Sequence, residues 1–273
     1  MTNEFQLFRN IRLILSDRPV IAGSDELMIC CCVSGVCEYH IGNEYHYLTD
    51  DTILAFGNTS DYTALCSKDF RGAFFIITAG SDNADLSDLF DISKLMHDIW
   101  HKTTLIYLSD SRTKNLLSAI ITGLEKSLIS LMRLKTIELL MQLSERKTDR
   151  KISKKAFQTG EFICRNTSEH FTIPQLSEMF GINQTKLKSD FRSTFGCGIY
   201  SYIKKRKVFR SAELLLQTNM KIIDIAEEVG YSNASKFASA FQSVMSITPK
   251  RFRMEHKSSK NPSDRHQTAV MRY

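Results

Sequence analysis

Five polar residues that can hydrogen-bond to nucleic acid gather in one short stretch: Gln184, Thr185, Lys188, Ser189 and Arg192. Their spacing places them on a helix face directed away from the apolar residues Leu187 and Phe191. Glutamine can pair with the edge of adenine, and lysine can reach guanine or a phosphate. The stretch therefore predicts base contacts from the first four residues and a phosphate contact from Arg192. The simpler interpretation is an ordinary solvated helix face.

A second stretch, fifty residues further along, has residues with mostly shorter side chains at matching positions: Ala234, Ser235, Lys236 and Ser239. Only the lysine is long, so this set offers less discrimination between bases. We expect both sets to contact DNA, and the first set to supply more of the sequence specificity.

The second set lies within residues 221–253, whose pattern predicts two helices and a tight turn. Gly230 ends the first helix, because glycine takes a left-handed conformation at little cost. Ser232 is expected to cap the next helix, whose apolar face begins at Phe237. Two helices crossed over such a turn form a helix-turn-helix, and its second helix fits the major groove. We call this segment the second unit.

Residues 171–196 are an earlier copy of the same pattern, which we call the first unit. Thr172 and Gln175 have the spacing of a capping box, and Pro174 falls in the first turn. Two units spaced in this way are more specific evidence than one, because a single helix-turn-helix pattern often arises by chance.

The alignment of the two units also predicts how they are joined. Gly181 aligns with Gly230 at an offset of 49 residues. Phe191 aligns with Phe241 at an offset of 50, so the second turn is one residue longer. A continuous helix over residues 200–217 would hold the units rigidly. Their second helices, about 34 Å apart, could then enter successive major grooves.

The sequence DIAEEVGYSNASKFASAF, followed by ITPKRFR, resembles the C-terminal signature of the AraC/XylS family of bacterial transcription regulators. The resemblance covers residues 159–253. It implies double-stranded promoter DNA as a partner and activation through contact with RNA polymerase. Two residues depart from the family pattern. Ser246 replaces a glycine, which predicts a strained turn, and Ser239 replaces an arginine that many members carry.

Residues 1–80 have the pattern of short antiparallel strands separated by polar turns. Strands are expected over residues 26–33, 36–41, 44–48, 52–56, 61–66 and 72–78. The run SGVCEYHIGNEYHYLTDDTILAF resembles the cupin-like effector domain at the N-terminus of many AraC-type regulators. The expected fold class is α+β. It combines an N-terminal cupin-like antiparallel β-barrel with helices and a C-terminal all-α domain of two helix-turn-helix units joined by a long helix.

Helical patterns follow over residues 86–101 and 113–145, the second with a break near Ser127. The apolar stripe of the second either packs on the barrel or pairs with another copy in a homodimer. We therefore divide the chain into four parts: a cupin-like sensing and dimerisation domain with amphipathic helices (1–145), a charged linker (146–157), an AraC-type double helix-turn-helix DNA-binding domain (158–257) and a disordered tail (258–273).

Charge is divided unevenly between the two halves. Residues 1–150 hold 15 Lys and Arg against 20 Asp and Glu, a net charge of −5. Residues 151–273 hold 21 against 10, a net charge of +11. This asymmetry is typical of a DNA-binding domain attached to a non-binding one. The basic residues 204–207, with Lys250, Arg251 and Arg253, are expected to add sequence-independent phosphate affinity.

The distribution of apolar residues also bears on where in the cell the protein is located. No apolar run reaches the length of a membrane span, and the first residues lack the apolar core of a secretory signal. We expect a cytoplasmic protein with no membrane partner. The seven cysteines are an odd number, and the CCC run at residues 30–32 is interpreted as a buried strand, which suits a reducing compartment.

The alternative function is a metal-dependent cupin-type enzyme with an accessory DNA-binding domain. His40 and His46 flank one hairpin, but a metal centre usually needs three or more protein ligands, so both are expected to face solvent. The HDIWH run at residues 97–101 has Asp98 where the HExxH motif has a catalytic glutamate. We expect no metal, cofactor or catalytic residue. A small-molecule or protein effector would act at the N-terminal domain, where no effector-binding residue is assigned.

Overall fold

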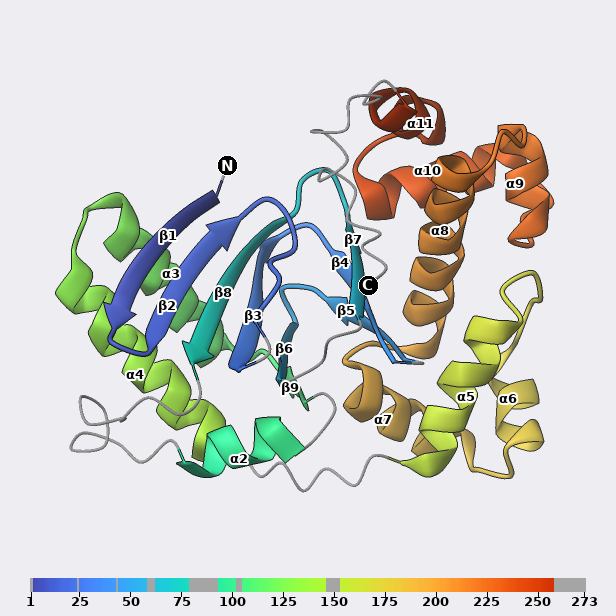
Figure 1. Cartoon of the computed structure of the whole chain (residues 1–273). Coiled ribbons are helices and arrows are strands. Elements are labelled where there is room, and N and C mark those ends of the chain that lie inside the picture. The colour runs from blue at the N-terminus through green and yellow to red at the C-terminus, as the bar shows by residue number, and fades with distance from the viewer. Residues whose placement is uncertain are drawn as a thin grey trace.

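The computed structural model describes residues 2–23, 25–42, 44–57, 62–78, 93–101, 105–145 and 153–257. A β-rich N-terminal half packs beside an all-helical C-terminal half (Figure 1). None of the described helices is long and apolar enough to cross a membrane. The expected tail, most of the expected linker and the first part of the helix expected at 86–101 lie outside the described residues.

The described strands form two antiparallel sheets. The larger has the order β1-β2-β8-β3-β6-β9 and the smaller has the order β5-β4-β7. Their bounds are β1 Thr2–Phe8, β2 Ile11–Ser16, β3 Glu26–Ser34, β4 Cys37–Ile41, β5 Glu44–Leu48, β6 Thr52–Gly57, β7 Tyr62–Cys66, β8 Arg71–Thr78 and β9 Leu105–Leu108.

The expected closed barrel is not found among the described residues, where hydrogen bonding joins the strands into two separate sheets. The six strands expected from the sequence are present, each within about two residues of its expected limits. Three more, β1, β2 and β9, extend the larger sheet on both sides. The added strands leave the larger sheet with its edges at β1 and β9 rather than closing it onto the smaller sheet.

Alternation along β3 explains why the cysteine run is buried. Successive side chains of a strand point to opposite faces. Cys31 therefore joins the core on the helix-covered face of the large sheet, while Cys30 and Cys32 join the core between the two sheets. All three are at most 6% exposed. The interpretation of this run as a buried strand is confirmed.

Three helices, α2 (Ser93–His101), α3 (Ser111–Glu125) and α4 (Ile129–Glu145), follow the strands. Buried residues of all three share a core with the large sheet, whose other face meets the small sheet. The break predicted near Ser127 is confirmed, because this residue has a φ of 54° between α3 and α4.

The C-terminal half is built of seven helices in the described residues: α5 (Lys154–Arg165), α6 (Ile173–Met179), α7 (Gln184–Phe195), α8 (Ile199–Gln217), α9 (Ile222–Glu228), α10 (Ala234–Met245) and α11 (Pro249–Lys257). The predicted long helix is α8, and it runs between the two units (Figure 1). Ser153 caps α5, so this helix begins before the domain boundary that we expected at residue 158.

A buried ion pair joins the two halves. Arg206 lies near the middle of α8, and its guanidinium donates to Glu38 of β4 at 2.8 Å and to Glu213 at 3.2 Å. Arg206 is 3% exposed and Glu38 is 4% exposed. The guanidinium also stacks over the Tyr45 ring, 3.8 Å from its centroid. Val36 and Tyr47 of the N-terminal half complete the apolar core of the C-terminal helices.

This ion pair predicts a pH dependence of stability. Burial raises the pKa of Glu38 to about 7. Arg206 partly offsets this rise in pKa, and the nearby Glu213 carboxylate adds to it. The folded state therefore keeps a proton on Glu38 between pH 4.5 and 7 that the unfolded state releases. We expect this group to lower the free energy of unfolding by about 3 kcal/mol as pH rises through that window.

Glu38→Gln removes the titration and keeps an oxygen that can accept from Arg206. Urea unfolding of both proteins at several pH values should show the wild type losing stability relative to the variant as pH rises. A difference that stays constant between pH 4.5 and 7 would contradict the prediction.

Candidate nucleic-acid interface

The first unit begins with the predicted capping box. The Thr172 hydroxyl accepts from the Gln175 amide, and the Gln175 side chain accepts from the Thr172 amide at 2.9 Å. After α6, Gly181 takes a φ of 57° and turns the chain. Asn183 then caps α7 by accepting from Thr185 N and Lys186 N. These local contacts fix where the second helix of the unit starts.

The second unit repeats this arrangement. Gly230 has a φ of 76° and ends α9 as predicted. The cap of α10 is Asn233 rather than Ser232, because its side-chain oxygen accepts from Ser235 N at 2.8 Å and from Lys236 N at 3.1 Å. Asn183 and Asn233 are both N-caps and lie fifty residues apart, which confirms the predicted offset between the second helices of the two units. We call α7 and α10 the reader helices.

The two reader helices end differently. The C-cap of α7 is Gly196 with a φ of 73°, and the C-cap of α10 is Ser246 with a φ of 58°. A left-handed conformation is costly for a residue with a Cβ. The structure therefore contains the strained turn that the replacement of glycine by Ser246 predicted.

All nine residues predicted to contact DNA are exposed, on the sides of the reader helices that face away from the core: Gln184, Thr185, Lys188, Ser189, Arg192, Ala234, Ser235, Lys236 and Ser239. On the opposite side, Leu187 and Phe191 of α7 and Phe237 and Phe241 of α10 have no exposed surface. Each set forms a solvent-facing strip at the beginning of its helix and one turn on.

A groove of about 450 Å³ lies along α10. Its lining includes Ser235, Lys236 and Ser239 from the predicted set, with Ser243, Ala240 and Lys204 of α8. Ser243 was not among the predicted contact residues, although it lies four residues after Ser239 on the same face. Lys204 was expected only as part of a basic cluster, and its place beside α10 depends on how the helices pack.

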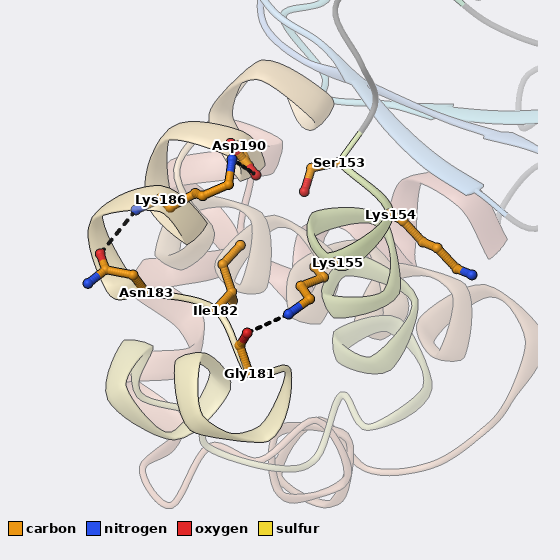
Figure 2. Close-up of a pocket in the computed structure, with 8 residues that line it drawn as sticks. All are labelled: Ser153, Lys154, Lys155, Gly181, Ile182, Asn183, Lys186 and Asp190. Carbon is orange, nitrogen blue, oxygen red and sulfur yellow. Dashed lines mark hydrogen bonds and ion pairs between the residues drawn. The ribbon is translucent and has the colours of Figure 1, made fainter.

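A larger pocket of about 620 Å³ opens beside the first unit (Figure 2), between the starts of α5 and α7. Lys154, Lys155 and Lys186 line it and make this part of the surface basic. Lys155 donates to the carbonyl of Gly181, and Lys186 pairs with Asp190 at 3.0 Å. These three lysines were not predicted. Lys186 aligns with Lys236 at the offset of 50, which is a signal that could have identified it.

The basic run at residues 204–207 is not a continuous phosphate-binding cluster. Lys204 is exposed, but Arg206 is buried by Glu38 and Lys207 is only 5% exposed. The reason is helical geometry, since four consecutive residues point in different directions and two of these face the core. Sequence-independent phosphate contact is therefore expected from Lys204 but not from Arg206 or Lys207.

Lys207 instead joins the two units. Its ammonium donates to Val229 O at 2.8 Å, at the end of α9, and reaches Ser168 O, in the loop before α6, at 3.5 Å. Burial lowers its pKa to about 8. Gly230 lies against the same groups, where a Cβ would come within 1.9 Å of Ser168 O. The turn of the second unit therefore requires glycine for its conformation and for its space.

The N-terminal half contacts the C-terminal ends of both reader helices. Lys68 N donates to Met245 O at 3.1 Å, at the end of α10. At the end of α7, Gly196 lies so close to Thr52 that a Cβ would come within 2.3 Å of Thr52 Cγ2. The predicted contact residues at the beginnings of these helices remain exposed.

The histidines of the sheets do not form the expected exposed pair. His46 is 3% exposed, with Nε2 2.9 Å from the Glu44 carboxylate. His40 is half-buried and stacks on the Tyr45 ring at 4.2 Å between centroids. His46 was expected to face solvent, but its register partner is Tyr39, which lies in the core between the two sheets, so His46 is on the covered face of the small sheet. Within the described ranges, no group of three or more His, Cys, Asp or Glu could hold a metal ion.

Comparison with known proteins supports the assignment of this domain. Residues 176–255 match a helix-turn-helix domain family. The HTH-type transcriptional regulator ExsA of Pseudomonas aeruginosa is 30% identical over 92 residues, which cover 34% of this chain and 33% of ExsA. The bifunctional transcriptional activator/DNA repair enzyme AdaA of Bacillus subtilis is 32% identical over 97 residues, 36% of this chain and 46% of AdaA.

Among solved structures, the C-terminal domain of the two-component response regulator yesN from Fusobacterium nucleatum is 28% identical, with a TM-score of 0.35. The match covers 37% of this chain and 99% of that one. The fold and the paired reader helices define a double helix-turn-helix protein. Through this C-terminal domain, the chain is similar to HTH-type transcriptional regulators. The match spans about a third of ExsA and just under half of AdaA.

The tight packing at Gly230 leads to a testable expectation. Gly230→Ala should lower the free energy of unfolding by more than about 2 kcal/mol, because the turn has positive φ and the added Cβ meets the Ser168 carbonyl. Gly198→Ala is the matched control, since its Cβ would meet nothing within 4 Å. We expect the control to change stability by at most about 1 kcal/mol in urea unfolding. Equal effects of the two variants would show that the turn is not constrained in this way.

Proposed function

We propose that this protein is a sequence-specific DNA-binding transcription regulator whose two reader helices enter successive major grooves. The observation that carries the proposal is the paired exposure of the predicted contact residues at the beginnings of α7 and α10. The net charge of +11 on residues 151–273 supports the same reading, because phosphate neutralisation dominates DNA affinity. We propose that the protein acts in the cytoplasm without a membrane partner, as its composition predicts.

We propose that the two units contribute differently to DNA recognition. Gln184 and Lys188 of α7 are long enough to reach base edges, whereas α10 presents mostly serine and alanine. Lys236 and Lys204, which line the groove beside α10, suit contact with phosphates. In this arrangement the first unit specifies bases and the second unit contributes mainly backbone affinity and position.

The direction of regulation is proposed to be activation, with RNA polymerase as a partner. The relative AdaA is a bifunctional transcriptional activator and DNA repair enzyme, and this similarity supports activation rather than repression. The N-terminal half would carry the controlling input, a small-molecule or protein effector, because it contacts both reader helices. No enzymatic role is proposed. Metal analysis of the purified protein tests the alternative, since stoichiometric iron, zinc or manganese would favour a cupin-type enzyme.

A homodimer is proposed through α4. Leu134 and Met141 are 60% and 38% exposed and lie seven residues apart on this helix, which places them on one face. Leu131 and Ile137, which belong to the same apolar stripe, are partly buried, and Ile137 packs on the N-terminal core. The exposed pair is therefore the better test of self-association.

We expect Gln184→Ala and Lys188→Ala to weaken binding to a selected duplex by about tenfold to a hundredfold, because a good base contact contributes about 1–3 kcal/mol. The duplex is obtained by selection from a random library, and affinities for it and for a scrambled duplex are measured by fluorescence anisotropy. Binding to the scrambled duplex should change much less. Lys114→Ala, which removes an exposed charge from the N-terminal half, is the control and should change neither affinity. Equal losses on both duplexes would refute base reading by these residues.

Replacing Leu134 and Met141 together with lysine should reduce self-association, because like charges would replace the apolar contact between two copies. Sedimentation velocity over a range of concentrations measures the effect. Ile21→Lys, at another exposed apolar residue, is the control and should leave the oligomeric state unchanged. A double variant that remains dimeric would exclude this face of α4 from the interface.

A further inference from the structure

Two cysteines face each other across the small sheet. Cys37 of β4 is the register partner of Cys66 of β7. The next pair along, Val36 and Ser67, is hydrogen-bonded, with Ser67 N donating to Val36 O at 2.8 Å. Because hydrogen-bonded and non-hydrogen-bonded pairs alternate in an antiparallel ladder, Cys37 and Cys66 occupy a non-hydrogen-bonded site.

That site has the dimensions a disulfide needs. The Cα atoms of a non-hydrogen-bonded pair lie about 4.5 Å apart, and disulfides span Cα separations of about 4.4–6.8 Å. Both side chains point into the core between the two sheets. The Cys66 side chain is close enough to Cys37 to raise the pKa of its thiol. The backbone therefore holds the sulfur atoms where only a small adjustment would join them.

The other cysteines have no such partner in the ladders. Cys30, Cys31 and Cys32 of β3 face Phe74, Ala73 and Gly72 of β8. On the β6 side, Cys30 and Cys31 face Leu54 and Ile53. Cys164 lies on α5, and Cys197 lies in the turn after α7. All seven cysteines are free thiols in the structure. The strand register thus selects one pair.

We propose that Cys37 and Cys66 form an oxidisable dithiol, which a small hydroperoxide converts into an intramolecular disulfide. The Cys66 sulfur attacks one peroxide oxygen, the O–O bond breaks, and a sulfenic acid forms with release of water. The Cys37 sulfur then attacks the Cys66 sulfur, the S–O bond breaks, and a second water leaves. Two thiols and one hydrogen peroxide give one disulfide and two waters, so two electrons pass from sulfur to oxygen.

The two thiols are suited to different steps. Cys66 is partly exposed, so a small oxidant can reach it, whereas Cys37 has no exposed surface. Burial raises the pKa of Cys37 well above its ordinary value, and the Cys66 thiol adds to that rise. Cys37 is therefore a poor first nucleophile toward peroxide and takes the resolving step, for which its position beside Cys66 suits it.

The place of this pair in the fold connects it to the second unit. Cys66 ends β7, and the next residues turn the chain against α10 and α11. Lys68 N donates to Met245 O at 3.1 Å, and the Lys68 ammonium pairs with Glu255 at 2.9 Å. A disulfide would form two residues before Lys68, which contacts the end of the second reader helix.

The test uses the full chain, treated with hydrogen peroxide, alkylated under denaturing conditions and cleaved after glutamate. Cleavage after Glu38 separates the peptide that contains Cys37 from the one that contains Cys66. We expect mass spectrometry to find these two peptides linked, with the loss of two hydrogens, and fragmentation to locate the link at Cys37. Dithiothreitol should release it.

Cys66→Ser and Cys37→Ala should each abolish the link, and Cys197→Ser should leave it unchanged. Cys66→Ser is the decisive variant, because this side chain is only partly buried and the substitution is small. Overturning results are a link from Cys66 to Cys30, Cys31 or Cys32, links only between molecules, or oxidation of Cys66 that stops at sulfinic acid without a link.

Discussion

The arrangement of the two halves depends on a buried positive charge that needs a partner, the guanidinium of Arg206. Arg206 lies in the interior, and a buried guanidinium without a carboxylate is strongly destabilising. Its carboxylate partners are Glu213 from its own helix and Glu38 from a strand 168 residues earlier. Packing α8 against the small sheet in any other register would separate Arg206 from Glu38. The contact between Arg206 and Glu38 therefore favours one relative placement of the N-terminal half and the helix that joins both units.

That single placement determines where the N-terminal half meets the reader helices. With Arg206 fixed near the middle of α8, β6 reaches the end of α7 at Gly196, and the turn after β7 reaches the end of α10 at Met245. Both contacts lie at the C-terminal ends of the reader helices and leave their beginnings exposed. A change in the N-terminal half could thus alter the angle between the readers without covering the residues proposed to contact DNA.

Caps, turns and apolar helix faces could be predicted from the sequence, whereas contacts between residues far apart in the chain could not. The capping box at Thr172, the turn at Gly230 and the apolar faces of α7 and α10 follow from spacing alone, and all are present. The burial of Arg206 and Lys207 was missed because a basic run usually indicates a surface, and their partners are far away in sequence. Asn233 and Ser232 are both good caps, so the geometry of the turn had to decide between them.

The strain at Ser246 shows how the two halves are coupled energetically. A left-handed serine persists only where its surroundings hold it, and the neighbouring Met245 carbonyl is held by Lys68 from the N-terminal half. The equivalent turn of the first unit has glycine at this position and needs no such support. The left-handed serine at the end of the second unit therefore depends on contact with the N-terminal half. If the second unit supplies position rather than base identity, as proposed, its short contact residues suit this role, because it could move without changing the DNA sequence that is read.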